Sequence, residues 1–208
     1  MSRLRLALSA AIVALLVGLR LAWVDGLLGA PGGEVFGHAW VQWWHARALP
    51  AWPAGPGALL LQPRPWPVID PLPTLLAAAL TRISGAVVGW NAMVMCAVML
   101  AFAGGARLAG RVGGDPVIGG LALALAPSLM GSAASGLTED LSIGLAALCL
   151  AHLGAEDARR SVLAGLFLGL LVWCGPLLAW ATGWVALGLG IVILIRDRGR
   201  WKGLVAAA

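Results

Sequence analysis

The residues best suited to chemistry lie between positions 34 and 49, in the stretch EVFGHAWVQWWHARAL. Drawn as a helix with about 100° between successive residues, this stretch gathers its polar side chains within an arc of about 80°. A carboxylate one helical turn from an imidazole is suited to general acid–base catalysis, because each group can accept a proton from a reacting hydroxyl. The polar arc consists of Glu34, His38, Gln42 and His45.

A metal site is not predicted in this arc. His38 and His45 are seven residues apart, which places them about 10.5 Å apart along a helix and too far apart to share one ion. The three cysteines lie inside apolar runs and lack metal-binding spacing such as C-x-x-C. The sequence therefore predicts no metal ligands and no cofactor, with a bound divalent cation as the open alternative.

Other charged residues near this stretch could bind a substrate, and each also has a structural explanation. Asp70 precedes Pro71 and is a natural helix N-cap. The acidic pair after Thr138 could stabilise the first turn of a helix, and arginines beside apolar runs often reach lipid phosphates. The predicted catalytic residue is Glu34, and the predicted substrate-binding residues are His38, Gln42, His45, Arg64, Asp70, Arg82, Glu139 and Asp140.

Composition determines the kind of fold that must position these residues. The chain has 208 residues, of which 61% are hydrophobic and 11% charged, and its mean hydropathy is +0.92. Soluble domains have roughly 45–50% apolar and about 25% charged residues, so a water-soluble globule is excluded. The sequence predicts an all-α, polytopic helical membrane protein. Its net charge of +5 arises mostly from residues that flank apolar runs, so nucleic acid is not an expected partner.

The apolar runs predict one membrane domain with about six spans. Residues 1–24 form the first span, and 25–85 form an outer loop with interfacial helices over 34–49 and 71–83. The five further spans lie within 86–195. Residues 196–208 are predicted to be a cytoplasmic turn and the start of a seventh span, so we expect a fragment of a longer protein. The five later spans are predicted over 86–106, 116–134, 137–153 and, divided at Gly175-Pro176, 161–195.

Basic residues orient the predicted spans. Ten of them fall on the side that holds the N-terminus, whereas only Arg47, Arg64 and Arg82 fall on the opposite side. This bias predicts a cytoplasmic N-terminus. Ten of the eleven tryptophans fall on the outer side, which is consistent with either an outer-leaflet ligand site or simply a thick outer loop.

Three short stretches together resemble the bacterial GT-C membrane glycosyltransferases: GGEVFGHAWVQWW after the first span, then IDPL, then GLTED after a later span. These enzymes use polyprenyl-phosphate sugars and are related to protein mannosyltransferases and aminoarabinose transferases. The resemblance implies a multi-pass protein of the bacterial inner membrane, of which this chain is the N-terminal half. It also implies a lipid-linked sugar donor, an acceptor hydroxyl, and Glu34 in the place of the family's acidic catalytic residue, which is usually Asp.

A non-enzymatic membrane protein is the alternative, such as a transporter or flippase segment or an assembly subunit, with membrane lipids as its partners. Ionisable residues are missing from the middle of the second to sixth predicted spans, whereas ion-coupled transporters usually carry them there. No Walker glycine loop, dinucleotide-binding motif, H-E-x-x-H or G-x-S-x-G is present. The sequence therefore favours chemistry at the outer surface over transport through the bundle.

Overall fold

A computed structural model describes residues 3–20, 23–24, 26–29, 34–48, 71–136, 142–153 and 157–196. Within these ranges the chain is helical except for one short hairpin and the connecting turns. The elements are α1 (Arg3–Arg20), β1 (Trp23–Val24), β2 (Leu27–Leu28), α2 (Val35–Ala48), α3 (Pro71–Ser84), α4 (Ala86–Arg111), α5 (Pro116–Ala124), α6 (Pro127–Ser135), α7 (Ile143–His152), α8 (Ala158–Cys174) and α9 (Pro176–Arg196).

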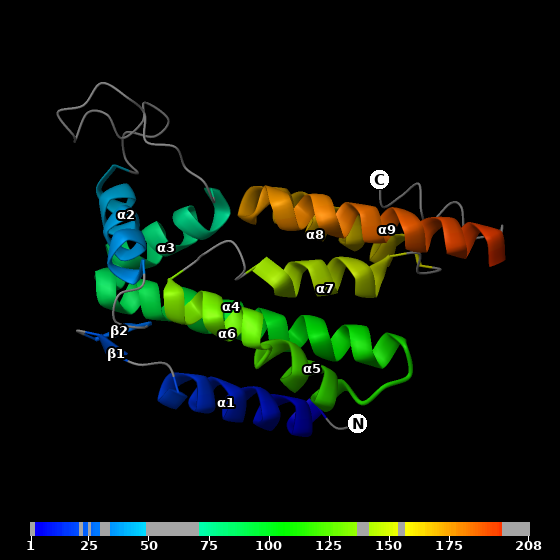
Figure 1. The fold of residues 1–208 in the computed structure, drawn as a ribbon, viewed down its shortest axis with the longest axis horizontal. Helices are drawn as coiled ribbons and strands as arrows, with labels where there is room; N and C mark the ends of the chain where they lie inside the picture. The colour runs from blue at the N-terminus through cyan, green and yellow to red at the C-terminus, as the bar shows by residue number, and fades with distance from the viewer. Residues whose placement is uncertain are drawn as a thin grey trace.

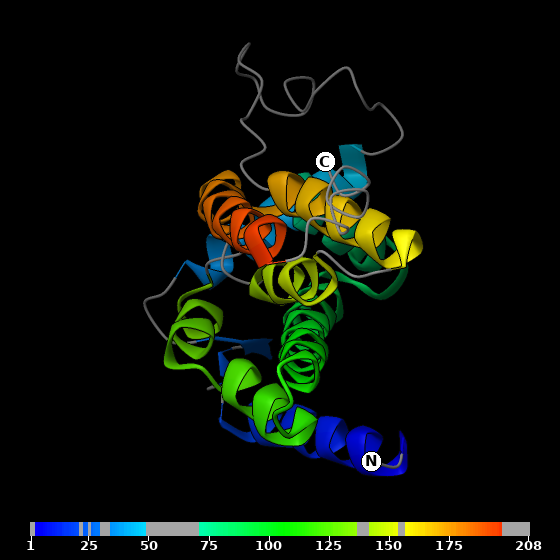
Figure 2. The same ribbon diagram turned by 90° about the vertical axis from the view of Figure 1, so that its right-hand side faces the viewer.

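Most helices run side by side along the long axis, in layers that Figure 2 shows nearly end-on. The α8–α9 pair forms one face, α7 lies beneath it, and α4 separates α7 from α5 and α1 (Figures 1 and 2). By contrast, α2 and α3 cross the start of α4 at one end of the molecule (Figure 1). The α2 end is the name used below for α2, α3, the hairpin and the first turns of α4.

Three described helical segments are long and apolar enough to cross a membrane: Ala86–Arg111, Pro116–Ser135 and Pro176–Ile195. The second of these comprises α5 and α6 together. Shorter apolar helical segments lie at Arg5–Leu15, Leu72–Ser84 and Ile143–His152. The described chain is therefore an all-α fold with membrane-length helices, in agreement with the predicted fold class at that level.

The first predicted span is longer than the helix that forms there. It extends to residue 24, whereas α1 ends at Arg20 and Trp23–Val24 pair in antiparallel fashion with Leu27–Leu28. The sequence between the strands is Asp25-Gly26, a residue pair favoured in two-residue hairpin turns. Gly26 has a φ of +83°, which glycine adopts without the steric cost of a side chain. The apolar pattern therefore continued past the end of the helix into a hairpin.

Prolines determine several of the later helix ends. The predicted break at Gly175-Pro176 is confirmed, because α8 ends at Cys174 and α9 begins at Pro176. The span predicted over 116–134 is divided, since Pro127 begins α6 after a short interruption, as expected where a proline removes a backbone donor. The span predicted over 86–106 continues as α4 to Arg111, and of the one predicted over 137–153 the structure describes α7.

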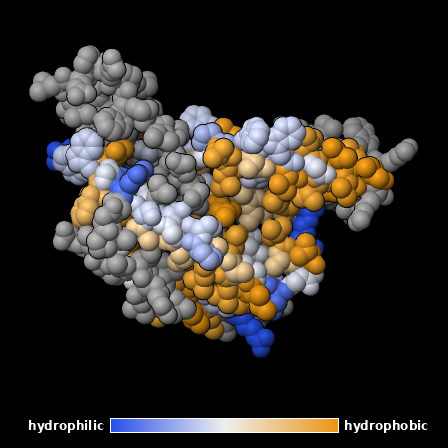
Figure 3. All heavy atoms as spheres, in the orientation of Figure 1, coloured by the Kyte–Doolittle hydropathy of each residue, from blue (hydrophilic) through white to orange (hydrophobic). Residues whose placement is uncertain are grey.

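The largest core cluster surrounds α4. Its buried members on that helix include Trp90, Val94, Val98, Ala101 and Phe102, and they pack against residues of α1, the hairpin, α2, α3, α5 and α6. By contrast, α8 and α9 present many large apolar side chains outward (Figure 3). An apolar surface of this kind is expected where helices face lipid. The core thus lies around α4, and the α8–α9 pair covers one side of the bundle.

Candidate functional site

Glu34 and His38 lie together at the start of α2. Glu34 immediately precedes the helix, and its carbonyl accepts the backbone N–H of His38, 3.0 Å away. Their side chains therefore lie one turn apart, with His38 Nε2 3.4 Å from Glu34 Oε2. Because a carboxylate only accepts hydrogen bonds, the imidazole Nε2–H is the donor. The Glu34 side chain is 70% exposed and that of His38 28%, so the carboxylate is open to a reacting group from outside.

Trp90 of α4 supports this pair from the buried side. Its ring lies 6.4 Å from the His38 ring, centroid to centroid, and its side chain is fully buried. The indole Nε1–H donates to the Leu28 carbonyl at 2.7 Å, so Trp90 also holds the hairpin. A buried indole usually requires such a partner. Trp90 thus joins α4, the hairpin and the start of α2.

Asn91 fixes the hairpin further. Its side-chain amide donates to the Gly26 carbonyl, and its side-chain oxygen accepts the Leu28 backbone N–H, both at 2.8 Å. Sequence reasoning did not identify Asn91 or Trp90 as contributors to the site. The available signal was the Asp25-Gly26 pair between apolar residues, which predicts a hairpin but not the side chains that hold it.

The start of α2 also contacts the end of α6. The Glu34 backbone N–H donates to the Ser135 carbonyl at 2.6 Å. Gly136 follows with a φ of +84°, and a Cβ placed on it would lie 2.6 Å from the Val35 backbone nitrogen. A residue with a side chain would therefore collide with the start of α2. Gly136 is the first residue of GLTED, so the structure brings the beginning of this stretch against GGEVFGH.

The predicted helix over 34–49 is confirmed as α2, but its buried face differs from the one expected. The buried side chains are Val35, Ala39, Gln42 and Ala46, which form a stripe of mostly small residues beside the predicted polar arc. Gln42 is only 3% exposed, and its Nε2 lies 3.4 Å from Met93 Sδ. Its placement on a surface-facing polar arc was therefore wrong, because α2 packs on α3 and α4 along that edge.

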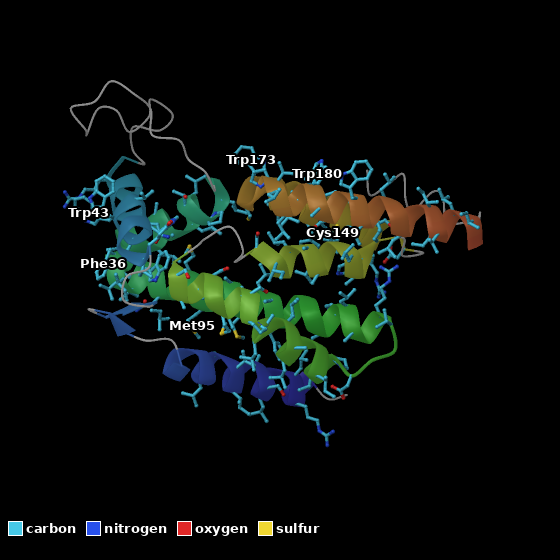
Figure 4. The ribbon with its side chains drawn as sticks, in the orientation of Figure 1. Phe36, Trp43, Met95, Cys149, Trp173 and Trp180 are labelled. Atoms are coloured by element: carbon cyan, nitrogen blue, oxygen red, sulfur yellow. The ribbon has the colours of Figure 1, made fainter. Side chains whose placement is uncertain are left out.

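α2 has an aromatic side, formed by Phe36, Trp40 and Trp43, that faces outward. Phe36 and Trp40 are exposed, and Figure 4 shows Phe36 and Trp43 extending away from the bundle. The Arg47 guanidinium carbon lies 4.0 Å from the centre of the Trp43 ring, in cation–π geometry. Aromatic and arginine side chains in this arrangement suit the headgroup region of a membrane.

The short helix predicted over 71–83 is confirmed as α3, with Arg82 exposed in its last turn. Thr81, the preceding residue, is buried against Gly89 of α4. Because Trp90 contacts His38, the last turn of α3 and the first turns of α2 adjoin the same turn of α4. The last turn of α3, which carries Arg82, thus lies against the same turn of α4 that contacts His38. No hydrogen bond joins the described side chains of Arg82 and Glu34.

The structure does not describe the side chains of the other predicted substrate-binding residues. Arg64, Asp70, Glu139 and Asp140 lie outside the described residues. His45 belongs to α2, but its side chain is likewise outside the described part of the structure. Among the described residues, no group of three His, Cys, Asp or Glu side chains could hold a metal ion. At the α2 end the structure therefore shows a carboxylate–imidazole pair at the start of α2, where Trp90 and the Ser135 carbonyl contact the helix.

Comparison with known proteins provides no relative for this chain. No family model, no curated protein sequence and no solved structure matches it.

Proposed function

We propose that this chain is the membrane domain of a glycosyltransferase that moves a sugar from a polyprenyl-phosphate carrier to an acceptor hydroxyl. The proposal combines the resemblance to the GT-C enzymes with the geometry of the α2 end. The observation that carries it is the exposed Glu34 carboxylate, paired with His38, where GGEVFGH meets the first residue of GLTED. Stretches far apart in the sequence thus meet at the acidic residue to which the resemblance gives a catalytic role.

In the proposed reaction Glu34 acts as the general base. It accepts the proton of the acceptor hydroxyl while that oxygen forms a bond to the anomeric carbon of the sugar. The bond between this carbon and the carrier's phosphate oxygen breaks, and the phosphate leaves with the electron pair. Arg82, and Arg64 outside the described residues, are the proposed positive charges that stabilise the departing phosphate. His38 positions the carboxylate by donating a hydrogen bond to one of its oxygens.

The surroundings of Glu34 support a reaction at a membrane surface. Exposed aromatic side chains of α2 suit contact with lipid headgroups and with the carrier's apolar chain. Among the described residues no Asp, Glu, Lys, Arg or His side chain is buried, so ionisable groups do not line the interior as they do in ion-coupled transporters. These features favour the transferase over the transporter alternative.

We also propose six membrane crossings, by α1, α4, α5–α6, α7, α8 and α9, with the α2 end outside. Successive members of this set run in opposite directions (Figure 1). Arg111 at the end of α4 donates to the Leu150 and Ala151 carbonyls at the end of α7, so these two ends lie together. Reporter fusions test the orientation: one at Pro56 should be active outside and one at Asp157 inside. The reverse pattern at either position would place Glu34 on the cytoplasmic side and contradict the proposal.

The decisive experiment is Glu34→Gln in the full-length protein, assayed with synthetic polyprenyl-phosphate hexoses and pentoses. Glutamine keeps the size of the side chain but removes the base, so transfer should fall about 10²- to 10⁴-fold. Binding of the donor, followed by tryptophan fluorescence, should change little because the aromatic side of α2 remains. His38→Asn should lower transfer less, by about tenfold, since it removes only a hydrogen bond to a charged group.

Asp25→Asn is the matched control, because it removes one carboxylate from the same region of the sequence and Asp25 has no predicted role in catalysis or binding. It should retain near-normal transfer. Loss of transfer in Asp25→Asn or Asp70→Asn, with normal transfer by Glu34→Gln, would show that another acid is the base. If the wild-type protein binds none of the lipid-linked sugars, the transferase proposal is wrong.

A further inference from the structure

A cluster of four arginines around a histidine lies at the end of the bundle opposite α2. It combines Arg107 and Arg111 from the last turns of α4, His152 from the end of α7, and Arg159 and Arg160 from the first turn of α8. Arg111 donates to the Leu150 and Ala151 carbonyls at the end of α7, and His152 packs against Phe167 of α8, so the three helix ends lie together. Figure 3 shows hydrophilic atoms between apolar surfaces at this end. These five residues are called the basic end below.

The carboxylates described near this cluster are already engaged. Asp157 accepts the Arg159 backbone N–H at 3.0 Å, and Asp115 accepts those of Val117 and Ile118 at 2.7 and 3.1 Å. Both therefore cap helix starts. Among the described residues, no ion pair joins a carboxylate to Arg107, Arg159 or Arg160. The guanidinium groups thus retain donors for an anion.

The position of Arg159 and Arg160 strengthens this argument. Both lie in the first turn of α8, where the helix dipole is positive and a basic side chain is unfavourable. Arg111, by contrast, has a structural use, because its Nη1 donates to the Leu150 and Ala151 carbonyls at 2.9 Å each. A bound anion would offset the repulsion between the dipole and the two arginines.

The surface next to the cluster is apolar. Val162, Leu163 and Leu166 follow the two arginines on α8 and are all exposed. His152 packs against Phe167 with ring centroids 5.8 Å apart, which places α7 beside this part of α8. A soluble phosphate would leave the apolar side chains uncovered, whereas the acyl chains of a phospholipid would cover them.

We propose that the basic end binds the phosphate headgroup of an anionic phospholipid, with Arg107 and Arg160 as the principal contacts. The acyl chains lie along Leu163 of α8, which is one helical turn beyond both Arg159 and Arg160, and continue over Val162 and Leu166 on the adjacent side of the helix. This site is independent of the proposed transferase function, because it lies at the opposite end of the bundle from Glu34.

Native mass spectrometry of the full chain, released from nanodiscs with and without phosphatidylglycerol, tests the proposal. The wild-type protein should retain phosphatidylglycerol in preference to phosphatidylcholine and should unfold at a higher temperature in its presence. The double variant R107Q/R160Q should bind phosphatidylglycerol about thirtyfold more weakly, which corresponds to about 2 kcal/mol. Arg111 is left unchanged because its substitution would uncap α7.

Two comparisons make the result decisive. R107K/R160K should retain most of the binding because the charges remain, and R5Q should retain it because Arg5 lies on α1, outside the cluster. Equal lipid binding by R107Q/R160Q and wild type would overturn the proposal, as would an equal loss in R5Q. If inorganic phosphate stabilises the wild type as much as phosphatidylglycerol does, the ligand is a soluble phosphate and the lipid assignment is wrong.

Discussion

α4 and α9 are both long apolar helices, but α4 is packed among other helices whereas most of α9 is exposed. In α4, 44% of the most apolar stretch is buried, whereas in α9 the share is 22%. Glycines on α4 meet neighbouring backbone: a Cβ on Gly104 would lie 2.6 Å from the Gly144 carbonyl oxygen, and one on Gly89 would lie 2.8 Å from the Thr81 backbone. On α9, Cβ atoms added to Gly183 and Gly188 would meet nothing within 4 Å.

This difference shows that similar apolar composition serves two purposes in this chain. Around α4, small residues let helices approach closely, which is how helices associate in lipid, where the hydrophobic effect provides little attraction between them. On α8 and α9, large side chains such as Trp173 and Trp180 point away from the bundle, as Figure 4 shows. Substitutions at α4 should therefore affect stability, and equivalent changes at α9 should not.

The largest expected effect is that of Gly144→Val at the contact between α7 and α4. A Cβ at Gly144 would lie 2.5 Å from the Leu100 carbonyl carbon, so valine must push the two helices apart. We expect a loss of about 3 kcal/mol in the free energy of unfolding, measured by denaturant titration in detergent micelles. Gly188→Val on α9 is the control and should change stability by less than about 0.5 kcal/mol. Equal effects of the two substitutions would contradict the comparison.

Trp90→Phe should have the next largest effect. It removes the indole donor 2.7 Å from the Leu28 carbonyl and leaves that carbonyl without its partner in a buried place. The expected cost is about 2 kcal/mol in the same titration. Trp184→Phe, an exposed position on α9, should cost less than about 0.5 kcal/mol. A neutral Trp90→Phe would show that the indole hydrogen bond does not stabilise the hairpin.

Asn91→Leu should act more locally, since it removes both 2.8 Å hydrogen bonds to the hairpin. One of these bonds is partly buried and the other is exposed, so we expect a cost of about 1 kcal/mol. Hydrogen exchange should accelerate in peptides that cover β1 and β2 and stay unchanged in α9. Asn91→Asp keeps the acceptor for the Leu28 N–H and should retain part of the protection. Unchanged exchange in Asn91→Leu would mean that other contacts hold the hairpin.

Gln42→Met should have the smallest effect. The Gln42 Oε1 is buried and has no hydrogen-bond partner among the described residues, so its removal should leave stability unchanged or raise it by up to about 1 kcal/mol. Because Gln42 faces the helix contacts, transfer should stay within about twofold of wild type, unlike the loss expected for Glu34→Gln. A large loss of transfer in Gln42→Met would instead assign Gln42 to substrate binding, as the helical wheel first indicated.

Several elements could be predicted from the sequence because their causes are local. Proline at positions 71 and 176 begins helices, and the 3.6-residue repeat places Glu34 and His38 on one side of α2. The end of α1 could not be found in this way. The apolar run continues beyond Arg20, and the hairpin that follows is held by Trp90 and Asn91, which lie far along the chain.

The candidate site likewise combines features with local causes and features set by residues far along the chain. Residue spacing predicts the Glu34–His38 pair, since both side chains belong to one turn. The burial of Gln42 depends on where α3 and α4 lie, because the periodicity of an isolated helix gives its faces but not its neighbours. The residues that support Glu34 belong to α4 or lie at the end of α6 and could not be assigned from the α2 sequence: Trp90, Ser135 and Gly136.

The sequence by itself determined the all-α class with apolar helices of membrane-spanning length, most helix starts and the spacing of Glu34 and His38. Prolines and the helical repeat act over a few residues, and composition does not depend on tertiary contacts. The tertiary structure decided which face of α2 is buried, that GGEVFGH meets Gly136, and that α4 and α8 both contact the end of α7. These outcomes depend on close approach between distant segments. Such approach is set by backbone contacts at Gly136 and Gly144, and a one-dimensional pattern does not encode which segment will provide the partner.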